Sequence, residues 1–529
     1  MIKELLQFDL CYKLRTMIKM AETKVVSFDE LSAHNTPEDC WLVIGGEVWD
    51  VSKFAPAHPG GSYCTFGCRC HSILGQMLMN AAVIYKYAAN DATEAFSEVH
   101  ASTVLRENLP VDCFIGALER SSIPKEWNSQ QQQQGQRKSV SESTAEEKPP
   151  LHSILNSYDF DASAAVFASK KAYTFYSTAD TDCWTRHANE AMLKRIWFRP
   201  RVMRNVESID TSGSMLGIPM ALPLFICPTG LAKLISPEAE NGLARAAKST
   251  GILEIISTSA SYPIQEIASQ APGYPFFLQL YVNKQRQKSV ELLSKARSMG
   301  MRAIFVTVDA AGRGKRESDE RLVVDEIIVS PVTGEQVKAD KKGGGLTRST
   351  GNYIDQSTTW DDIAWIRQHT DLPIVLKGIG SAEDARLAMA HNVDGILLSN
   401  HGGRNLDYSP PAILLLLEMH RCCPEIFDKM EVFVDGGFRR GADVLKALCL
   451  GAKAVGIGRT FLYALNYGTE GVEHLVEIIQ SELESAMKLI GVKDLSEVHP
   501  GLVNTSDVDH LVPVNTNHPY VRWRSTPKL

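Results

Sequence analysis

Residues 395–404 read Gly-Ile-Leu-Leu-Ser-Asn-His-Gly-Gly-Arg. Four apolar residues, the length of a short buried strand, lead directly into a histidine, two glycines and an arginine. His401 can take up a proton near neutral pH, and the guanidinium of Arg404 can hold a carboxylate through two parallel hydrogen bonds. The stretch predicts a strand with a base and a fixed cation at its carboxyl end, although alone it would fit an ordinary polar turn equally well.

Seven further apolar runs of strand length accompany this one. Most of the eight are followed by a longer segment of helical composition, such as 237–250, 288–299, 381–391 and 441–450. Strands that alternate with helices indicate parallel βαβ units, and eight such units predict an α/β fold, the closed (β/α)8 TIM barrel. The eight runs are 223–227, 252–256, 276–281, 303–308, 373–376, 395–398, 431–434 and 454–457.

Groups able to form hydrogen bonds follow every one of these runs. In a (β/α)8 barrel the carboxyl ends of the strands lie on one face, and active sites are built there from several strands. The sequence therefore predicts one composite site. Its members are Thr229, Ser257, Gln279, Tyr281, Thr307, Asp309, Lys377, Ser399, His401, Arg404, Asp435, Gly436, Gly437, Arg439, Gly458 and Arg459.

Four motifs in this half of the chain carry a family resemblance. They are QLYVN at 279–283, Thr307–Asp309 with Gly314-Lys315-Arg316, LSNHGGRNLD at 398–407 and FVDGGFRRG at 433–441. Together they resemble the FMN-dependent α-hydroxy acid dehydrogenase and oxidase family, over roughly residues 152–500. The resemblance implies FMN as cofactor and oxidation of an L-2-hydroxy acid to the 2-oxo acid.

The expected FMN contacts follow from residue chemistry and position. The glycines and arginines after the last two strands lie where barrels commonly bind phosphate. Lys377 can place an ammonium beside the ring nitrogen that gains negative charge on reduction. The expected cofactor-binding residues are Thr229, Ser257, Gln279, Thr307, Lys377, Ser399, Asp435, Gly436, Gly437, Arg439, Gly458 and Arg459.

The expected catalytic residues surround the substrate. His401 is the proposed base, and Asp309 keeps it oriented and basic, since a carboxylate favours the imidazolium. Arg404 holds the substrate carboxylate, Arg316 supports it from a mobile loop at 316–350, and Tyr281 binds the hydroxyl or the developing carbonyl. Transfer of a hydride and formation of a carbanion both remain open.

Three residues depart from the family pattern. Phe175-Tyr176 stands where the family has adjacent tyrosines, so one hydroxyl for the substrate carboxylate is missing. Gly230 replaces a usual alanine, and Ser259 replaces a bulky residue at another wall of the pocket. Both changes are expected to make room for a larger or aromatic 2-hydroxy acid.

The N-terminal part resembles a second family. His34–Trp41, Glu47–Val51, His58-Pro59-Gly60-Gly61 and His100 are similar to the α+β cytochrome b5 haem-binding domain. The resemblance implies haem b with His58 and His100 as the axial metal ligands. Joined to the barrel, the two modules resemble the flavocytochrome lactate dehydrogenases, which implies electron transfer to haem and to an external acceptor such as cytochrome c.

Two other functions remain open at this point. An FMN oxidase, with a haem module that no longer works, would use every barrel residue named above. An electron carrier would need only residues 24–120, but it leaves His401, Arg404 and Lys377 without a role.

The haem module carries an apparent insertion at residues 63–81. His58 and His100 are 42 residues apart, a much longer span than the family uses. The segment contains Cys64, Cys68, Cys70 and His71, but their spacing fits no standard zinc pattern. A tolerated loop insertion and a retained intron are the two interpretations.

The expected organisation is an extension at 1–23, the haem domain at 24–120, a flexible linker at 121–150, the barrel at 151–500 and a tail at 501–529. The linker contains five consecutive glutamines and too few apolar residues to fold. A net charge of −7 argues against nucleic-acid binding, and no apolar stretch reaches the length of a membrane span.

The eleven cysteines show no disulfide framework, which indicates a reducing or mixed compartment. Residues 1–20 read neither as a clean transit peptide nor as a signal sequence, and Met20 is an alternative start. The family resemblance implies a homotetramer in the mitochondrial intermembrane space, with a cytoplasmic location as the alternative.

Overall fold

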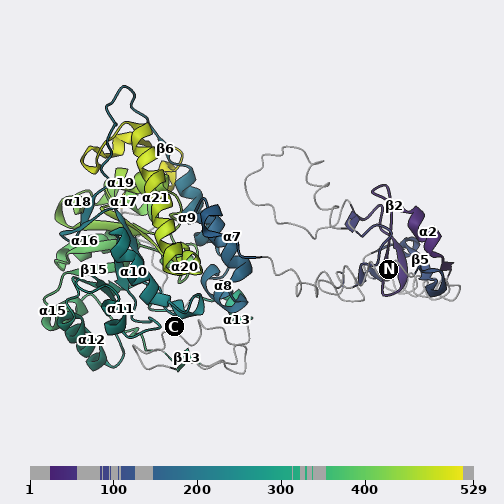
Figure 1. Cartoon of the computed structure of the whole chain (residues 1–529), viewed down its shortest axis with the longest axis horizontal. Coiled ribbons are helices and arrows are strands. Elements are labelled where there is room, and N and C mark those ends of the chain that lie inside the picture. Colours follow the sequence, from purple (N-terminus) through teal and green to yellow (C-terminus); the bar gives the residue numbers. More distant parts are fainter. Residues whose placement is uncertain are drawn as a thin grey trace, which may run out of the picture. The chain divides into compact units, whose positions relative to one another are not determined.

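The computed structural model of the chain describes residues 24–55, 84–85, 87–93, 96, 105–106, 109–124, 147–312, 314–321, 328–329, 336–337 and 353–515. Two compact units divide the chain, residues 1–147 and residues 148–529 (Figure 1). No helix in the described ranges combines the length and the apolar character that crossing a membrane requires.

The N-terminal unit is built on a mixed five-stranded sheet of order β1-β5-β4-β3-β2. Only the β1–β5 pair is parallel. Helix α2 (Phe28–Ala33) connects β1 to β2 and is capped by the Ser27 hydroxyl, which accepts a hydrogen bond from the Glu30 N–H at 3.3 Å. The strands are β1 (Val25–Val26), β2 (Asn35–Thr36), β3 (Asp39–Ile44), β4 (Glu47–Asp50) and β5 (Phe114–Leu118).

Apolar side chains cover both faces of this sheet, because successive side chains along β3 point to opposite faces. Cys40 and Leu42 join an apolar cluster with Trp49 and with side chains from residues 84–114, whereas Trp41 and Val43 pack on the other face. His58 and His100, and residues 63–81, lie outside the described residues.

The second unit confirms the predicted (β/α)8 barrel. Its closed parallel order is β10-β11-β12-β15-β16-β17-β18-β9, and helices surround the strands (Figure 1). The predicted runs coincide with the strands to within a few residues; the largest difference is the fifth, which continues to Ile379. The strands are β9 (Leu224–Ile226), β10 (Leu253–Ile256), β11 (Phe277–Leu280), β12 (Ile304–Thr307), β15 (Ile374–Ile379), β16 (Gly395–Leu398), β17 (Glu431–Asp435) and β18 (Ala454–Ile457).

Helices of the barrel unit precede the first strand or follow the later strands. Those before the first barrel strand in this unit are α7 (Ser157–Phe167), α8 (Lys170–Ser177) and α9 (Trp184–Lys194). The others are α10 (Ala239–Thr250), α11 (Ile264–Ser269), α12 (Arg286–Ser298), α13 (Glu317–Glu320), α15 (Asp362–His369), α16 (Ala382–Ala390), α17 (Ala412–Cys422), α18 (Ile426–Lys429), α19 (Gly441–Cys449), α20 (Arg459–Leu465) and α21 (Gly468–Ile490).

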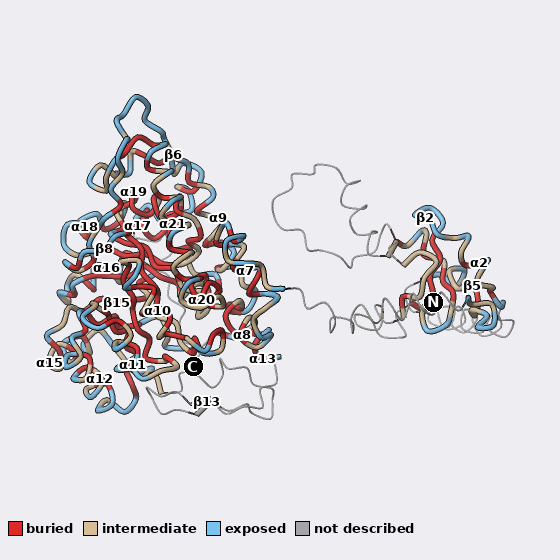
Figure 2. The backbone as a smooth tube through the Cα atoms, viewed as in Figure 1, coloured by how far each residue is buried: buried red, intermediate tan, exposed pale blue. Residues whose placement is uncertain are grey.

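The barrel interior is a packed core (Figure 2). Phe225, Phe277, Phe305 and Phe433 point inward from four strands and form one buried cluster. A hairpin of β7 (Gly213–Met215) and β8 (Ile218–Met220) contributes Met215, Ile218 and Met220 to the same cluster. The residues in between, such as Leu224 and Ile226, pack outward against the helices.

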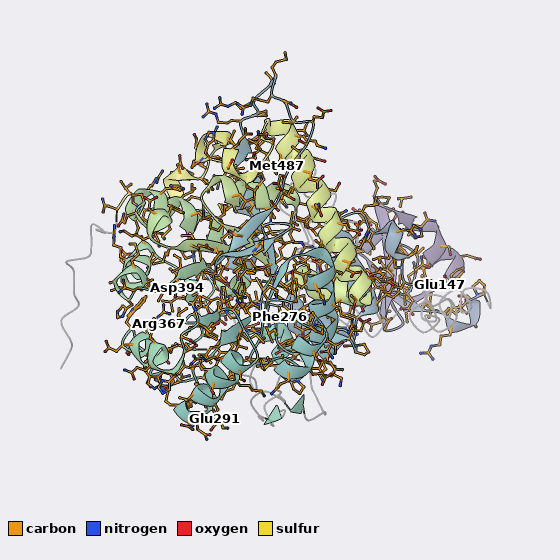
Figure 3. The ribbon with its side chains drawn as sticks, turned by 60° about the vertical axis from the view of Figure 1, so that its left-hand side comes forward. Glu147, Phe276, Glu291, Arg367, Asp394 and Met487 are labelled. Carbon is orange, nitrogen blue, oxygen red and sulfur yellow. The ribbon has the colours of Figure 1, made fainter. Side chains whose placement is uncertain are left out.

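Ionic contacts tie together strand starts, at the face opposite the predicted site. The Asp394 carboxylate accepts a hydrogen bond from the Ile374 N–H at 2.8 Å, which joins the starts of β15 and β16. Arg367 forms an ion pair with the same carboxylate and donates to the Asn392 carbonyl at 3.1 Å (Figure 3). These contacts serve stability, and the opposite ends of the strands remain available for chemistry.

Part of the predicted tail at 501–529 packs against the barrel unit. β19 (Val503–Asn504) pairs antiparallel with β6 (Trp197–Phe198), and Val508 and Val512 are buried in the core of the barrel unit. No local pattern indicates this pairing, because a two-residue strand has no periodicity and its partner strand, at 197–198, lies far earlier in the chain. Residues 516–529 lie outside the described part.

The interruption between β12 and β15 contains short ordered elements. Helix α13 begins directly after Arg316, and β13 (Ile328–Val329) pairs antiparallel with β14 (Gln336–Val337). The glycine-rich residues 341–345 lie outside the described ranges.

Candidate active site

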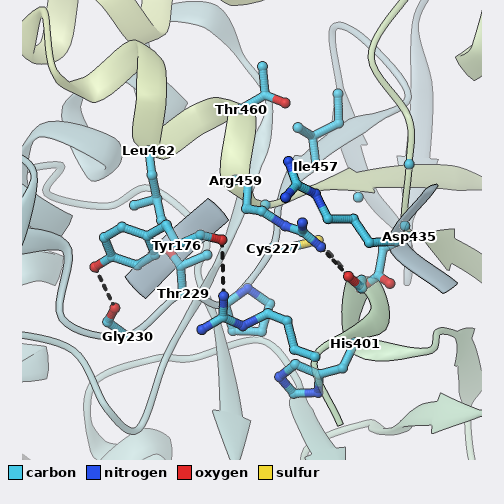
Figure 4. Close-up of a pocket in the computed structure, with 18 of the residues that line it drawn as sticks. Tyr176, Cys227, Thr229, Gly230, His401, Asp435, Ile457, Arg459, Thr460 and Leu462 are labelled. Atoms are coloured by element: carbon cyan, nitrogen blue, oxygen red, sulfur yellow. Dashed lines mark hydrogen bonds between the residues drawn. The ribbon is translucent and has the colours of Figure 1, made fainter. Parts of the chain in front are cut away.

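One pocket lies at the carboxyl ends of the barrel strands (Figure 4). Most of the predicted site residues line it. They are Thr229, Gly230, Ser257, Ser259, Tyr281, Arg316, Lys377, His401, Arg404, Asp435, Gly436, Gly437, Arg439, Gly458 and Arg459. Asp309, Gln279, Thr307 and Ser399 stand behind this wall and contact residues that line it or support it.

His401 is held by hydrogen bonds on two sides. Its Nδ1 lies 2.9 Å from Oδ1 and 3.2 Å from Oδ2 of Asp309, and its backbone N–H donates to the Ser399 hydroxyl at 3.1 Å. Burial would raise the pKa of Asp309, but the charge and hydrogen bond of His401 lower it below its usual value. The carboxylate is thus ionised, and it leaves Nε2 of the imidazole as the nitrogen available to a substrate.

Asn405 holds Asp309, the partner of His401. Its amide donates to the Asp309 carbonyl at 2.8 Å and lies 3.4 Å from the Asp309 carboxylate. Residues 401–403 form a short 3-10 turn in which His401 and Gly402 both have positive φ. The turn places the histidine at the carboxyl end of the strand. A side chain at residue 402 would collide with Arg459, whose Nη2 lies 2.5 Å from the place of a Cβ on Gly402.

Lys377 belongs to a second buried network. Its Nζ lies 3.2 Å from the Asp435 carboxylate and donates to the Ser399 hydroxyl at 3.1 Å. Ser399 in turn donates to Asp435 at 2.5 Å, and the Cys227 thiol approaches the same carboxylate at 3.6 Å. Burial alone would lower the pKa of Lys377, but Asp435 and then Asp309 raise it above its usual value. The lysine therefore stays charged.

Three arginines crowd one side of the pocket. Burial, followed by the charge of Arg316, lowers the pKa of Arg404 to about 9. Burial lowers the pKa of Arg316 and of Arg459 to about 10. Nη1 of Arg404 donates to the carbonyls of Phe175 and Tyr176 at 2.9 and 3.0 Å, and Nε of Arg316 donates to the Arg404 carbonyl at 3.4 Å. Like charges held this close favour an anion between them.

Gln279 is fixed by its neighbours behind the pocket. Its carbonyl accepts hydrogen bonds from the N–H and the hydroxyl of Thr258 at 3.1 and 3.0 Å, and its amide donates to the Thr307 hydroxyl at 3.0 Å. All three side chains are buried. The chain of hydrogen bonds joins the ends of β10, β11 and β12 and sets which way the Gln279 amide faces.

The phosphate side of the pocket contains glycines that a side chain could not replace. Gly436 and Gly437 have φ of 104° and 85°, and a Cβ on Gly437 would lie 2.7 Å from Asn189. The backbone here carries no side chains and has positive φ, which favours glycine, and both properties suit close approach of a phosphate. Arg439 is less available than expected, because its guanidinium pairs with Asp161 at 3.1 Å and lies over the Tyr158 ring at 4.4 Å.

The part of the pocket wall formed by Gly230 and Ser259 differs from the sequence-based expectation at Gly230. A Cβ on Gly230 would lie 2.7 Å from the Cβ and 3.0 Å from the carbonyl oxygen of Ser259. Gly230 thus lets two loops approach each other and does not leave a hole of its own. Ser259 lines the pocket, and its hydroxyl lies 3.3 Å from that of Tyr353. The room predicted here depends on Ser259.

The Phe175-Tyr176 pair lies in the pocket wall as predicted, with different roles for the two rings. The Phe175 ring lies 5.2 Å from the Arg404 guanidinium. The Tyr176 hydroxyl donates to the Gly230 carbonyl at 2.9 Å (Figure 4) and to the Leu231 carbonyl at 2.6 Å. Tyr176 therefore serves the backbone of the wall.

The sequence-based reasoning missed several residues that support the site. Thr258 and Tyr353 stand next to predicted positions, and Asn189 forms a reciprocal amide pair with Asn400 at 2.8 and 3.0 Å. Arg186 also lines the pocket. Asn400 adjoins His401 in the chain and could have been singled out, but Asn189 and Arg186 come from α9, which has no motif of its own.

Two family models match this chain. Residues 164–505 match the FMN-dependent dehydrogenase family, and residues 27–65 match the cytochrome b5-like heme/steroid binding domain. The L-lactate dehydrogenase (cytochrome) of Wickerhamomyces anomalus is 35% identical over 93% of this chain and 82% of its own length. The enzyme of the same name from Saccharomyces cerevisiae is 38% identical over 91% and 80%. Glycolate oxidase of Spinacia oleracea is 39% identical over 65% of this chain and 94% of its own length.

Solved structures give the same result for the barrel. A flavocytochrome b2 variant with benzoylformate bound is 38% identical, covers 75% of this chain and 98% of its own, and has a TM-score of 0.63. Mandelate oxidase with (S)-4-hydroxymandelic acid is 32% identical over 66% of this chain and 98% of its own, with a TM-score of 0.61. The chain belongs to the FMN-dependent dehydrogenase family, as an α-hydroxy acid oxidoreductase of the flavocytochrome b2 type whose barrel uses FMN and whose N-terminal domain is the cytochrome b5-like haem module.

Proposed function

We propose that this protein oxidises an L-2-hydroxy acid to the 2-oxo acid, with the electrons passed to haem and to an external acceptor such as cytochrome c. The observation that carries the proposal is the pairing of His401 with Asp309 beside the crowded Arg404 and Arg316. A base whose second nitrogen has no partner among the described residues, next to a concentrated positive charge, suits a substrate that carries both a removable proton and a carboxylate.

The residues act on the substrate as follows. Arg404 and Arg316 bind the carboxylate, which relieves the repulsion between the two guanidinium groups. Tyr281 lines the pocket and binds the substrate hydroxyl; burial is the main reason that the pKa of Tyr281 is raised, so the phenol stays protonated and can donate. His401 accepts one substrate proton at Nε2, and Asp309 stabilises the imidazolium that results.

The cofactors fit the residues present. Gly436, Gly437, Gly458 and Arg459 would hold the FMN phosphate, and Thr229, Ser257 and Lys377 would border the ring. When bound, FMN supplies a two-electron acceptor and haem b a one-electron carrier. Lys377 would hold a positive charge beside the ring, with Asp435 and Ser399 fixing its position. His58 and His100 are the proposed haem ligands.

Substrate size is the finer part of this proposal. The relatives of known structure include a flavocytochrome b2 variant with benzoylformate bound and a mandelate oxidase with an aromatic ligand. Ser259 presents a small side chain to the pocket here, so that an aliphatic or aromatic extension can fill the space. Each buried methylene contributes ~0.8 kcal/mol, about a four-fold change in affinity.

We therefore expect kcat/KM for mandelate and other long 2-hydroxy acids to exceed that for lactate. Ser259→Leu should fill the pocket and reverse this order, as steady-state kinetics on both acids would show. Gly230→Ala is the less suitable variant, because its methyl would collide with Ser259. A wild-type enzyme that clearly prefers lactate would restore the plain lactate dehydrogenase function.

An absorption spectrum of the purified protein tests the function as a whole. Flavin and b-type haem bands are expected together, and anaerobic addition of a 2-hydroxy acid should reduce both. Flavin reduction without haem reduction, with rapid consumption of oxygen, would favour the oxidase function that the glycolate oxidase relatives suggest. Haem without substrate-reducible flavin would favour a simple electron carrier.

The assembly and location complete the proposal. By family resemblance we propose a homotetramer in the mitochondrial intermembrane space. Sedimentation of the holoenzyme would test the oligomeric state, and fractionation of its source cells would test the location. We also propose that the haem domain spans residues 24–120 and the linker residues 121–150.

A further inference from the structure

A buried glutamate outside the catalytic set connects two loops of the pocket wall. Glu240 lies at the start of α10, and its side chain is buried. Its Oε1 accepts hydrogen bonds from the Ala232 N–H at 3.1 Å and from the Ser261 N–H at 2.9 Å. Ala232 follows Gly230 after β9, and Ser261 follows Ser259 after β10. One carboxyl oxygen thus holds both loops.

Further contacts join the same two loops directly. The Leu231 N–H donates to the Ser259 carbonyl at 3.0 Å, and the Lys233 N–H donates to the Ser261 hydroxyl at 3.0 Å. Leu231 has a φ of 61°, a left-handed conformation that an ordinary residue keeps only where its surroundings impose it. The Tyr176 hydroxyl binds the two carbonyls that precede Ala232.

The spacing of these loops has little tolerance. The place of a Cβ on Gly230 is only 2.7 Å from Ser259, so the two loops are in close contact and a change in their spacing would move Ser259. Ser259 also lines the pocket, and the proposed function places it beside the substrate side chain. A group that fixes the loops therefore fixes the width of the pocket at that wall.

We propose that Glu240 is a positioning residue that sets selectivity for the substrate side chain by holding the Gly230 and Ser259 loops at their present spacing. The inference rests on the proposed oxidation of 2-hydroxy acids. Glu240 itself lines no part of the pocket in the described residues. It acts through the backbone of the two loops and takes no part in the chemistry at His401.

A set of variants of the full-length holoenzyme tests this role. Glu240→Met keeps the volume of the side chain but removes the acceptor. We expect kcat/KM for mandelate to fall roughly five-fold or more, the effect of about one net hydrogen bond on the wall, while kcat/KM for lactate changes less than about two-fold because a methyl group does not reach that wall. Flavin content should stay unchanged.

Two further variants make the result specific. Burial raises the pKa of Glu240, and the N–H groups of Ser261 and Ala232 offset this in part, so a neutral amide is a fair replacement. Glu240→Gln keeps an acceptor oxygen and should keep the wild-type ratio. Glu254→Gln is the matched control: Glu254 is a buried carboxyl on β10 with no hydrogen bond to either loop in the described part of the chain, and its change should leave the ratio unaltered.

Several results would overturn the inference. An equal fall for both substrates in Glu240→Met would show a general structural role, and an unchanged ratio in the folded variant would show no role at all. If Glu240→Met does not fold, Glu240→Asp, one methylene too short to reach both N–H groups, should show the same loss of ratio or else refute the proposal. A wild-type enzyme that oxidises neither acid would refute the proposed function instead. The relative binding of benzoylformate and pyruvate to the variants would then still test whether Glu240 controls the width of the pocket.

Discussion

His401→Gln should lower the rate of substrate-driven flavin reduction by roughly 10²- to 10⁴-fold, the usual contribution of a general base. The imidazole is held by Asp309 through Nδ1 at 2.9 Å, which leaves Nε2 as the acceptor of the substrate proton. Glutamine retains much of the shape of the side chain, but its amide cannot take up a proton near neutral pH. Anaerobic stopped-flow mixing with the preferred 2-hydroxy acid would measure the rate.

Asp309→Asn provides the companion test. Asparagine keeps the size of the side chain but removes the negative charge that stabilises the imidazolium, so the rate should fall, by a smaller factor than in His401→Gln. The bound FMN should be retained in both variants, as the flavin spectrum would show. Near-normal turnover in His401→Gln would remove this residue from the mechanism.

Arg404→Lys should raise KM and lower kcat together. The planar guanidinium offers two parallel donors to a carboxylate, and an ammonium cannot reproduce this fork. Hydrogen bonds to charged groups contribute roughly 1.5–3 kcal/mol each, so kcat/KM should fall about ten- to one-hundred-fold. The lysine would also lose the three backbone carbonyls that now fix the Arg404 side chain. Steady-state kinetics with a 2-hydroxy acid would measure both constants.

Phe175→Tyr is a matched change with the opposite sign. The Phe175 ring already packs beside Arg404 in the pocket wall, and a hydroxyl there could donate to the same carboxylate. One neutral hydrogen bond contributes roughly 0.5–1.5 kcal/mol, so KM should fall about two- to ten-fold. Efficient oxidation of plain alcohols by the wild type, or an unchanged kcat/KM in Arg404→Lys, would contradict the carboxylate-binding role.

The barrel was predictable because its signals are local. A buried parallel strand is an almost continuous apolar run, and each of the eight runs carries its polar residue directly after it. Gly395–Leu398 with His401 and Arg404 is the clearest case, and the structure brings these groups together with Lys377, Tyr281 and Asp435 in one pocket. Because the barrel is closed, strands that follow one another in the sequence lie side by side around a ring, and their carboxyl ends meet at one face.

Contacts between distant segments were beyond the reach of such reasoning. Arg439 was expected at the phosphate, but α7 supplies Asp161, which pairs with it at 3.1 Å. Residues 503–504, within the predicted tail, pair with residues 197–198. Neither partner has a motif, since a single aspartate on a helix or a two-residue strand looks the same whether or not it meets another segment.

By itself, the sequence determined the kinds of group available and the strand end at which each would stand, because both depend on residue type and on positions a few residues apart. The tertiary structure decided how those groups face one another. The 2.9 Å between His401 and Asp309, the crowding of Arg404 with Arg316, and the collision that Gly230 avoids with Ser259 all depend on side chains and loops from different strands. Distances between segments far apart in the chain are fixed by the packing of the whole barrel, and no local pattern records them.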